Sequence, residues 1–376
     1  MLALNPGVAH QLATPKLLHI MGDAAPTWMT EGDKMRLKKS GKKFADLTNH
    51  QNVLGDAGGL CLHSPADLPN LTHQNLIKPL FPLVNKERMY GVVKHMTSYY
   101  NRMYRSTHGQ LSSEWLHDHI AEIIAAAPFG THISLEYFPH AFPQSSIVAR
   151  FEPKVRNFSQ PVTILGAHQD SANYLFPLLP APGADDDCSG SVSILEAFRV
   201  LAGAGYTPLG GPVEFHWYAA EEAGLLGSLD IAAYKRAQNQ PIGAMMEFDM
   251  TAFVARNTTE SIAMVSTQAD SALTNWTVEL GKEYISIPID VFELGPNAGS
   301  DYMSFTMHNY PAAFATEGNP MHGGFPGDMC PYVHGVGDRM DVDDDKGYFS
   351  IDHMARFTEL AIAYTIEQAG WNNKWR

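Results

Sequence analysis

Short hydrophobic runs and longer helical stretches alternate along most of the chain after residue 77. Apolar runs bounded by polar or glycine-rich segments are typical of buried strands, and apolar residues recurring every three or four positions are typical of helices. The runs that predict strands are 145–151, 162–167, 213–219, 244–249 and 261–266. The stretches that predict helices are 86–100, 191–202, 225–237 and 351–369.

One more helix is predicted before the first of these strands. Ser112 or Ser113 can cap its start, and Pro128 would end it. Its apolar face would consist of Trp115, Ile120, Ile123, Ile124 and Ala127. Alternating strands and helices predict an α/β fold with a mostly parallel central β-sheet sandwiched by helices. The ligand site of such a sheet lies beyond the carboxyl ends of its strands.

The first part of the chain has a different pattern and no strong periodicity. It contains a basic patch at 34–43 and a stretch at 55–69 rich in Gly, Pro, Asp and Ser. We therefore expect an amino-terminal extension over 1–77 and an α/β domain over 78–376. A flexible extension and a functional prosegment both fit this pattern.

The net charge and the lengths of the apolar runs limit the kinds of partner and of membrane association that we expect for the protein. Among its 376 residues, 40 are acidic and 26 basic, which gives a formal charge of -14 and argues against nucleic acid as a partner. No run of 18 apolar residues occurs, so we expect no transmembrane helix. Three cysteines do not make a disulfide framework.

Four N-glycosylation sequons favour a secreted glycoprotein, although the chain begins without a signal peptide. Their asparagines are Asn70, Asn157, Asn257 and Asn275.

Side chains that can bind a metal follow each central strand of the predicted sheet. His168 and Asp170 follow the run 162–167, and Glu221 and Glu222 follow the run 213–219. Asp249 ends the run 244–249, and the loop 183–190 (GADDDCSG) carries three consecutive aspartates. Each motif alone is common in loops, but their shared position at strand ends indicates one site.

The residue types of this predicted site suit zinc. Histidine and carboxylates bind Zn²⁺, and no set of thiolates competes for it. Two metal ions about 3.5–4 Å apart need a carboxylate between them, and Asp186 suits that position. Asp170 can accept the second imidazole N–H of His168 and fix its tautomer. Of Glu221 and Glu222, one can bind metal while the other acts as a base toward water.

A last histidine ligand is expected late in the chain. Among His308, His322, His334 and His353, we favour His334, in the loop PYVHGVGD before the final helix. His322 lies in a Gly- and Pro-rich loop and is the second choice. His353 lies within the final helix and is expected to be structural.

In order along the chain, the segments GAHQDS, APGADDDCSGS, WYAAEEAGLLGS, EFDMT, YPAAFATE and HGVGD resemble the di-zinc leucyl aminopeptidase family of secreted bacterial and fungal enzymes, in metallopeptidase clan MH. The resemblance covers roughly residues 85–370 and implies the zinc aminopeptidase (phosphorylase/hydrolase-like) fold. It implies two zinc ions and peptide substrates with a free amino terminus, cut after a large apolar residue such as Leu. We expect a monomer.

Carried onto this chain, the resemblance implies that His168 and Asp186 hold one zinc, and Asp186 and Asp249 the other. Glu222 and His334 would both bind the zinc that Asp249 does not bind, together with His168 and Asp186. Glu221 would be the general base toward a water activated by zinc, and Asp170 would orient His168.

Some positions depart from the family pattern. Gly295 and Gly299 stand where several members have a cysteine pair, and Tyr302 replaces a histidine. Asn297 stands where members often have a tyrosine near the oxyanion, and its amide could donate a hydrogen bond there. The residues that could line an apolar substrate pocket are Met250, Phe314 and Val333; core packing would explain them equally well.

Three other functions are compatible with parts of the pattern. A glutaminyl cyclase-like enzyme would use one metal, and the AAEE and DMT segments argue against it. A carboxypeptidase would need a cation for the substrate carboxylate, for which Arg256 and Arg339 are candidates. A non-catalytic binding protein on the peptidase fold would have lost ligands, whereas every expected position here is occupied.

The segments WMTEGDK and KFADLT in the amino-terminal extension resemble the prosegment of fungal family members.

Overall fold

The fold, given by a computed structural model, is described for residues 6–54, 68–295 and 298–372. Its larger part is built on an eight-stranded sheet. The strand order is β11 (Ile289–Phe292), β10 (Ile262–Val265), β12 (Ala312–Glu317), β8 (Ile242–Phe248), β6 (Val162–His168), β7 (Val213–Tyr218), β5 (Ser146–Phe151) and β4 (Ile133–Phe138). The central strands β12, β8, β6 and β7 are parallel, while β5, β4 and the β10–β12 pair are antiparallel. The predicted fold class is confirmed.

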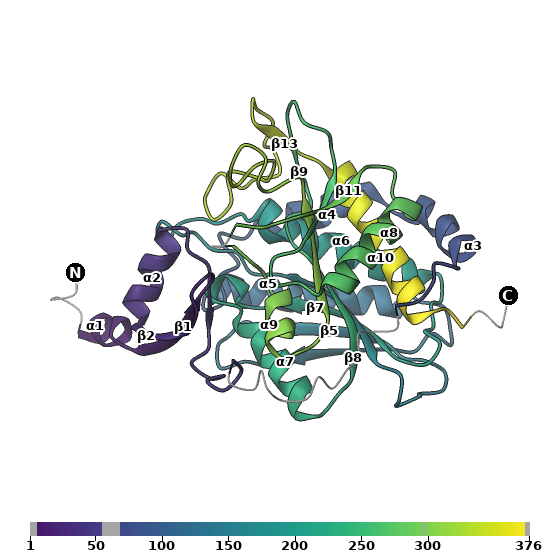
Figure 1. Cartoon of the computed structure of the whole chain (residues 1–376), viewed down its shortest axis with the longest axis horizontal. Coiled ribbons are helices and arrows are strands. Elements are labelled where there is room, and N and C mark those ends of the chain that lie inside the picture. The colour runs from purple at the N-terminus through teal and green to yellow at the C-terminus, as the bar shows by residue number, and fades with distance from the viewer. Residues whose placement is uncertain (1–5, 55–67, 296–297, 373–376) are drawn as a thin grey trace.

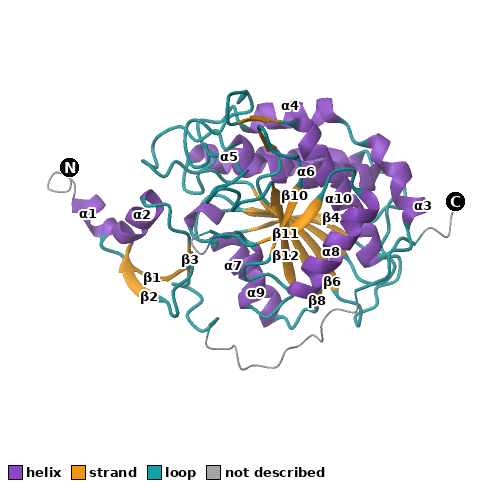
Figure 2. Ribbon diagram, turned by 45° about the horizontal axis from the view of Figure 1, so that its top comes forward, coloured by secondary structure: helices purple, strands orange, loops and turns teal. Residues whose placement is uncertain are grey.

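Helices cover both faces of this sheet (Figure 2). Alternate residues of β8 point to opposite faces, so Met246 enters one hydrophobic core and Met245 the other. The helices of the first core are α3 (Gln74–Ile77), α4 (Lys86–Met96), α5 (Thr107–Ala125), α6 (Gly190–Gly203), α8 (Ser271–Tyr284) and α10 (Ile351–Ala369). Those of the second are α7 (Leu226–Ala237) and α9 (Tyr302–Met307). A separate strand pair joins β9 (Phe253–Ala255) and β13 (Gly347–Phe349).

The structure confirms α6, α7 and α10 and corrects two helix boundaries. The predicted cap of α5 was wrong: Ser106 is the N-cap and accepts a hydrogen bond from the Gly109 amide at 2.9 Å. Ser112 and Ser113 are buried within the helix. The helix start was mispredicted because the first turns of α5 are polar, so the apolar pattern begins only after them. Helix α4 ends at Met96 rather than near residue 100.

Residues 6–54 form a small folded unit. It consists of α1 (Pro6–Leu12), β1 (Pro15–Ile20), β2 (Thr27–Thr30), α2 (Glu31–Lys39) and β3 (Phe44–Asp46), with the antiparallel strand order β2-β1-β3. Thr30 and Asp33 form a capping box at the start of α2. These elements are too short to produce a strong periodicity, which is why the sequence pattern did not show them.

This amino-terminal unit lies at one end of the molecule, in purple in Figure 1, and packs against the larger part. Leu17, Leu47 and Val53 enter the second core beside α7 and α9. The Asp46 amide donates to the Gly224 carbonyl at 2.9 Å. Ile77, in contrast, is buried in the first core, so the described residues just before position 78 pack with the sheet.

Within the described residues, no helix has the length and apolar character needed to cross a membrane. Cys188 and Cys330 are buried free thiols, and Cys61 lies outside the described residues.

Candidate metal centre

Three neighbouring parallel strands bring their polar ends together. His168 is the last residue of β6, Asp249 follows β8, and Glu221 and Glu222 lie in the short 3₁₀ turn after β7. Strand β6 pairs in parallel with both β7 and β8, so the three carboxyl ends meet at one edge of the sheet. The loop before α6 adds Asp186. The strand-end position predicted from the sequence is therefore the position that the structure shows.

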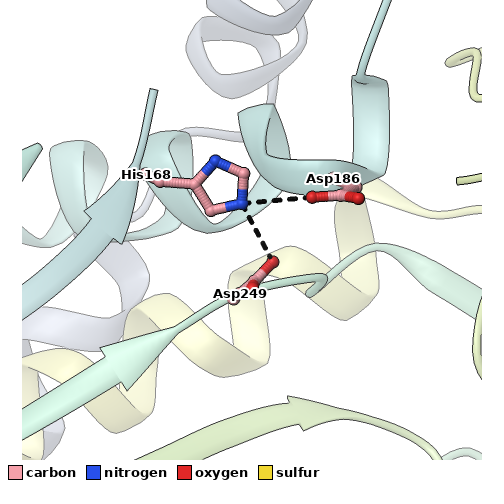
Figure 3. A group of neighbouring side chains, drawn as sticks. All are labelled: His168, Asp186 and Asp249. Carbon is pink, nitrogen blue, oxygen red and sulfur yellow. Dashed lines mark ion pairs between the residues drawn. The ribbon is translucent and has the colours of Figure 1, made fainter. Parts of the chain in front are cut away.

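His168, Asp186 and Asp249 form a first group (Figure 3). The Nε2 atom of His168 lies 3.1 Å from Oδ1 of Asp186 and 3.6 Å from Oδ1 of Asp249. All three residues are buried.

Asp186, Glu222 and His334 form a second group. The Nε2 atom of His334 lies 2.9 Å from Oδ2 of Asp186 and 3.6 Å from Oε2 of Glu222. Asp186 thus turns one carboxylate oxygen toward each histidine and belongs to both groups.

The predicted set of five residues is brought together, but the structure groups them differently from the expected division. Asp249 lies with His168, and not apart from it, because β8 and β6 are adjacent strands. Glu222 and His334 lie together, as the resemblance implied, but in the group that does not contain His168.

The two groups fit metal cations. In each, the candidate ligand atoms lie within 4.8 Å of one another. Nε2 of His168 and Oδ1 of Asp249 are buried, and neither has a hydrogen-bond partner in the described part of the chain. Burying these polar atoms without hydrogen bonds is costly, and a bound cation would reduce that cost. Imidazole and carboxylate together are ligands that zinc accepts.

Asp170 connects the β6 and β7 ends of the site. Its carboxylate accepts the main-chain N–H groups of Glu221 at 3.0 Å and Glu222 at 3.3 Å. The Nδ1 atom of His168 lies 3.2 Å from the Asp170 carbonyl oxygen and 3.4 Å from its Oδ1. Asp170 therefore holds the glutamate turn as well as facing the imidazole.

Two further aspartates fix the ligand-bearing loops, and the sequence reasoning assigned neither a role. Asp187 accepts the main-chain N–H groups of His168 and Met250, both at 3.1 Å. Asp338 accepts those of Asp185 at 2.8 Å and Asp186 at 3.0 Å. Their places in conspicuous segments could have pointed to them, since Asp187 is the third aspartate of the triplet and Asp338 is the last residue of HGVGD.

The buried charges shift one another's protonation. Burial raises the pKa of Glu221 to about 7, against the opposing influence of Lys43. Burial would also raise the pKa of Asp186, but His334 and His168 outweigh it and hold that pKa well below its usual value. Glu221 is thus suited to exchange protons near neutral pH, while Asp186 stays ionised.

Two lysines of the amino-terminal unit enter this site, which the sequence did not predict. The Nζ atom of Lys43 forms an ion pair with Oε1 of Glu221. Lys38 lies over the ring of Tyr174, 5.3 Å from its centroid, and burial lowers the pKa of Lys38 to about 8. The Tyr174 ring in turn stacks on His334.

The other late histidines lie outside both groups. His322 is 60% exposed and bonds to Asp328 at 2.8 Å, and His353 on α10 bonds to Glu260 at 2.9 Å. Nδ1 of His308 lies 2.7 Å from the Ser304 carbonyl oxygen. The structure thus favours His334 over His322 as the late ligand.

The predicted substrate-contacting residues have mixed placements. Met250 and Phe314 are buried in the second core, and Val333 packs against it. Phe314 stacks on Tyr302 with ring centroids 5.2 Å apart, so Tyr302 is part of the same packing. Asn297 lies outside the described residues.

The two candidate arginines for a carboxypeptidase are exposed and already paired. Arg256 forms an ion pair with Asp343, and Arg339 forms one with Asp341. Neither pairing partner belongs to the metal groups, which argues against a role in binding a substrate carboxylate there.

Comparison with known proteins is consistent with this site. The sequence profile of peptidase family M28 matches residues 146–357. The chain is 35% identical to leucine aminopeptidase 1 of Colletotrichum graminicola over 349 residues, 90% of this chain and 82% of that protein. It is 34% identical to leucine aminopeptidase 1 of Trichoderma harzianum in a match that covers 97% of this chain and 90% of that protein. The crystal structure of the LapA aminopeptidase of Legionella pneumophila matches with a TM-score of 0.78, 26% identity and 96% coverage of both chains.

Proposed function

Because the chain belongs to peptidase family M28 and is a zinc-dependent aminopeptidase, we propose that it removes amino-terminal residues from peptides at a centre of two zinc ions. The proposal of two ions rests on the carboxylate of Asp186, because one of its oxygens faces His168 and the other faces His334. His168 and Asp249 would hold one ion, Glu222 and His334 the other, with Asp186 between them.

The residues around this centre have separate roles in the proposed reaction. Bound zinc supplies Lewis acidity toward the peptide carbonyl and activates water at neutral pH. Glu221 takes a proton from the attacking water and returns it to the leaving amine. Asp170 fixes the glutamate turn and faces His168, so the base and the first histidine keep their relative positions.

We propose a preference for a large apolar amino-terminal residue such as Leu. Met250, Phe314 and Val333 belong to one apolar cluster, and Met250 directly follows the proposed ligand Asp249. An apolar wall beside the ions would bind an apolar side chain and exclude water from it.

The amino-terminal unit is proposed to be an inhibitory prosegment. Its Lys43 forms an ion pair with Glu221, the carboxylate that the proposed reaction needs as a base, and Lys38 lies over the ring of Tyr174 beside His334. We also propose that the protein is a secreted, monomeric glycoprotein. All four sequon asparagines are exposed, as attachment of a glycan requires.

Hydrolysis of Leu-p-nitroanilide by the zinc-loaded protein tests the proposed function, with the amino-acetylated form of the substrate as the matched control. We expect cleavage of the free-amine substrate alone, lost on chelation and restored by zinc. Equal cleavage of the blocked substrate would contradict an aminopeptidase. A zinc titration that ends at one ion per chain would contradict the two-ion centre. Rates on Leu, Ala and Lys derivatives test the apolar preference.

A further inference from the structure

Tyr174 lies flat against His334. The two ring centroids are 3.8 Å apart and the ring planes differ by 6°. The main-chain N–H of Tyr174 also donates to the carbonyl of His334 at 3.0 Å. The loop after β6 thus contacts His334 through both its side chain and its backbone, although the two residues are far apart in sequence.

The two candidate ligand histidines are oriented in different ways. A histidine that binds a metal usually has a hydrogen-bond partner at its second ring nitrogen, which fixes the ring. His168 has such a partner in the Asp170 carbonyl, 3.2 Å from its Nδ1. For Nδ1 of His334, the described part of the chain provides no hydrogen bond. Its ring is held instead by the flat contact with Tyr174.

The backbone of His334 also needs support. Its φ of 58° lies in the left-handed region, which costs a residue with a side chain on the order of 1 kcal/mol or more. Such a conformation persists only where neighbouring contacts impose it. The hydrogen bond from Tyr174 to the His334 carbonyl is one of those contacts.

We propose that Tyr174 is a positioning residue for one zinc ion, holding His334 through the flat contact of its ring and through the hydrogen bond from its main-chain N–H. This inference rests on the proposed two-zinc centre. The other ion should not depend on Tyr174, because His168 is oriented by Asp170 and Asp249 by its place at the end of β8.

Zinc affinity measured step by step tests this role without an activity assay. The full-length zinc-free protein is titrated with zinc in competition with a chromophoric chelator, so that two binding constants are resolved. Tyr174→Ala is expected to weaken one constant by about 10–100-fold, the usual effect of losing a ligand's support, and to leave the other unchanged. Tyr174→Phe keeps the ring that stacks on His334 and should leave both constants close to their wild-type values. Phe176→Ala, an exposed position on the same loop, is the matched control and should change neither.

The outcomes separate this inference from the proposed function. Wild-type affinity for both ions in Tyr174→Ala would overturn it, and so would an equal loss at both sites, which indicates general destabilisation. If Tyr174→Ala does not fold, Tyr174→Leu, which fills the space without an aromatic ring, decides: weakening at one site supports the role, and two wild-type constants overturn it. If the wild-type protein binds only one zinc, the two-ion centre fails, whatever the variants show.

Discussion

The ammonium group of Lys43, on the amino-terminal unit, forms an ion pair with the carboxylate of Glu221 at the end of β7. Both side chains are largely buried, with 14% and 1% of their surfaces exposed. Burial opposes a charged lysine, but Glu221 and Glu222 outweigh it and hold the pKa of Lys43 above its ordinary value. The proposed general base is therefore engaged by a cation that is part of the same chain.

Removing that cation should activate the full-length protein. In Lys43→Ala, Glu221 becomes free to accept a proton and the path to it opens, so we expect kcat/KM on Leu-p-nitroanilide to rise by about tenfold or more, equivalent to about 1.4 kcal/mol. Lys42→Ala, at the exposed neighbouring position, is the control and should have wild-type activity. Equal activity in wild type and Lys43→Ala would refute an inhibitory role for this ion pair.

Glu221→Gln should abolish hydrolysis while keeping both metal ions. The amide has nearly the shape of the carboxylate but cannot take a proton, and general-base groups contribute about 10²–10⁴-fold to rates. Zinc content and kcat are measured on the same preparation. Glu136→Gln, exposed on β4, provides the control. A variant with full activity would end the assignment of Glu221 as base.

His334→Ala should lower zinc occupancy from two ions toward one per chain, because it removes the histidine that faces Asp186 and Glu222. Loss of such a ligand should also reduce activity strongly. His322→Ala changes an exposed histidine bonded to Asp328 and should keep both ions. Elemental analysis of zinc per chain, after dialysis against a weak chelator, distinguishes the two variants. The opposite pattern would mean that the late ligand is His322.

Acid should weaken the contact between the amino-terminal unit and α7. Asp230 accepts hydrogen bonds from His50, on that unit, and His140 at 2.9 and 2.7 Å. Burial would raise its pKa, but these two partners outweigh burial and lower it from 3.8 to about 2. A lowered folded-state pKa stabilises the fold above pH 3.8, and that contribution is lost as pH falls through about 2.

The variant Asp230→Asn has no ionisable side chain at this position, so the free energy of unfolding of the variant should depend less on pH between 4 and 2. The difference in unfolding free energy between variant and wild type should change by roughly 2 kcal/mol across that range. Denaturant unfolding at several pH values measures it. Identical pH slopes for the two proteins would show that Asp230 contributes nothing to this dependence.

The local pattern of the sequence was enough to predict the central architecture. The apolar runs that became β6, β7 and β8 are fully buried strands, and parallel strands of this kind end at a common edge. His168 and Asp249 follow directly from that rule, because each lies at or just after a strand end. The rule also predicts the glutamate pair, but the resemblance was needed to assign Glu222 as the ligand and Glu221 as the base. Asp186 and His334 lie in loops without periodicity, and their residue types and places in the chain selected them.

Contacts between segments distant in sequence could be decided only by the tertiary structure. No periodicity links Lys43 to Glu221 or Tyr174 to His334, because the two residues of each pair lie far apart in the sequence. The division of ligands between the two groups likewise depends on β8 lying beside β6. The sequence by itself determined the strands and the chemistry at their ends. The packing of the amino-terminal unit and of the loops decided which further side chains contact the candidate metal ligands and Glu221. The direction of those side chains is fixed only when the elements that carry them pack together.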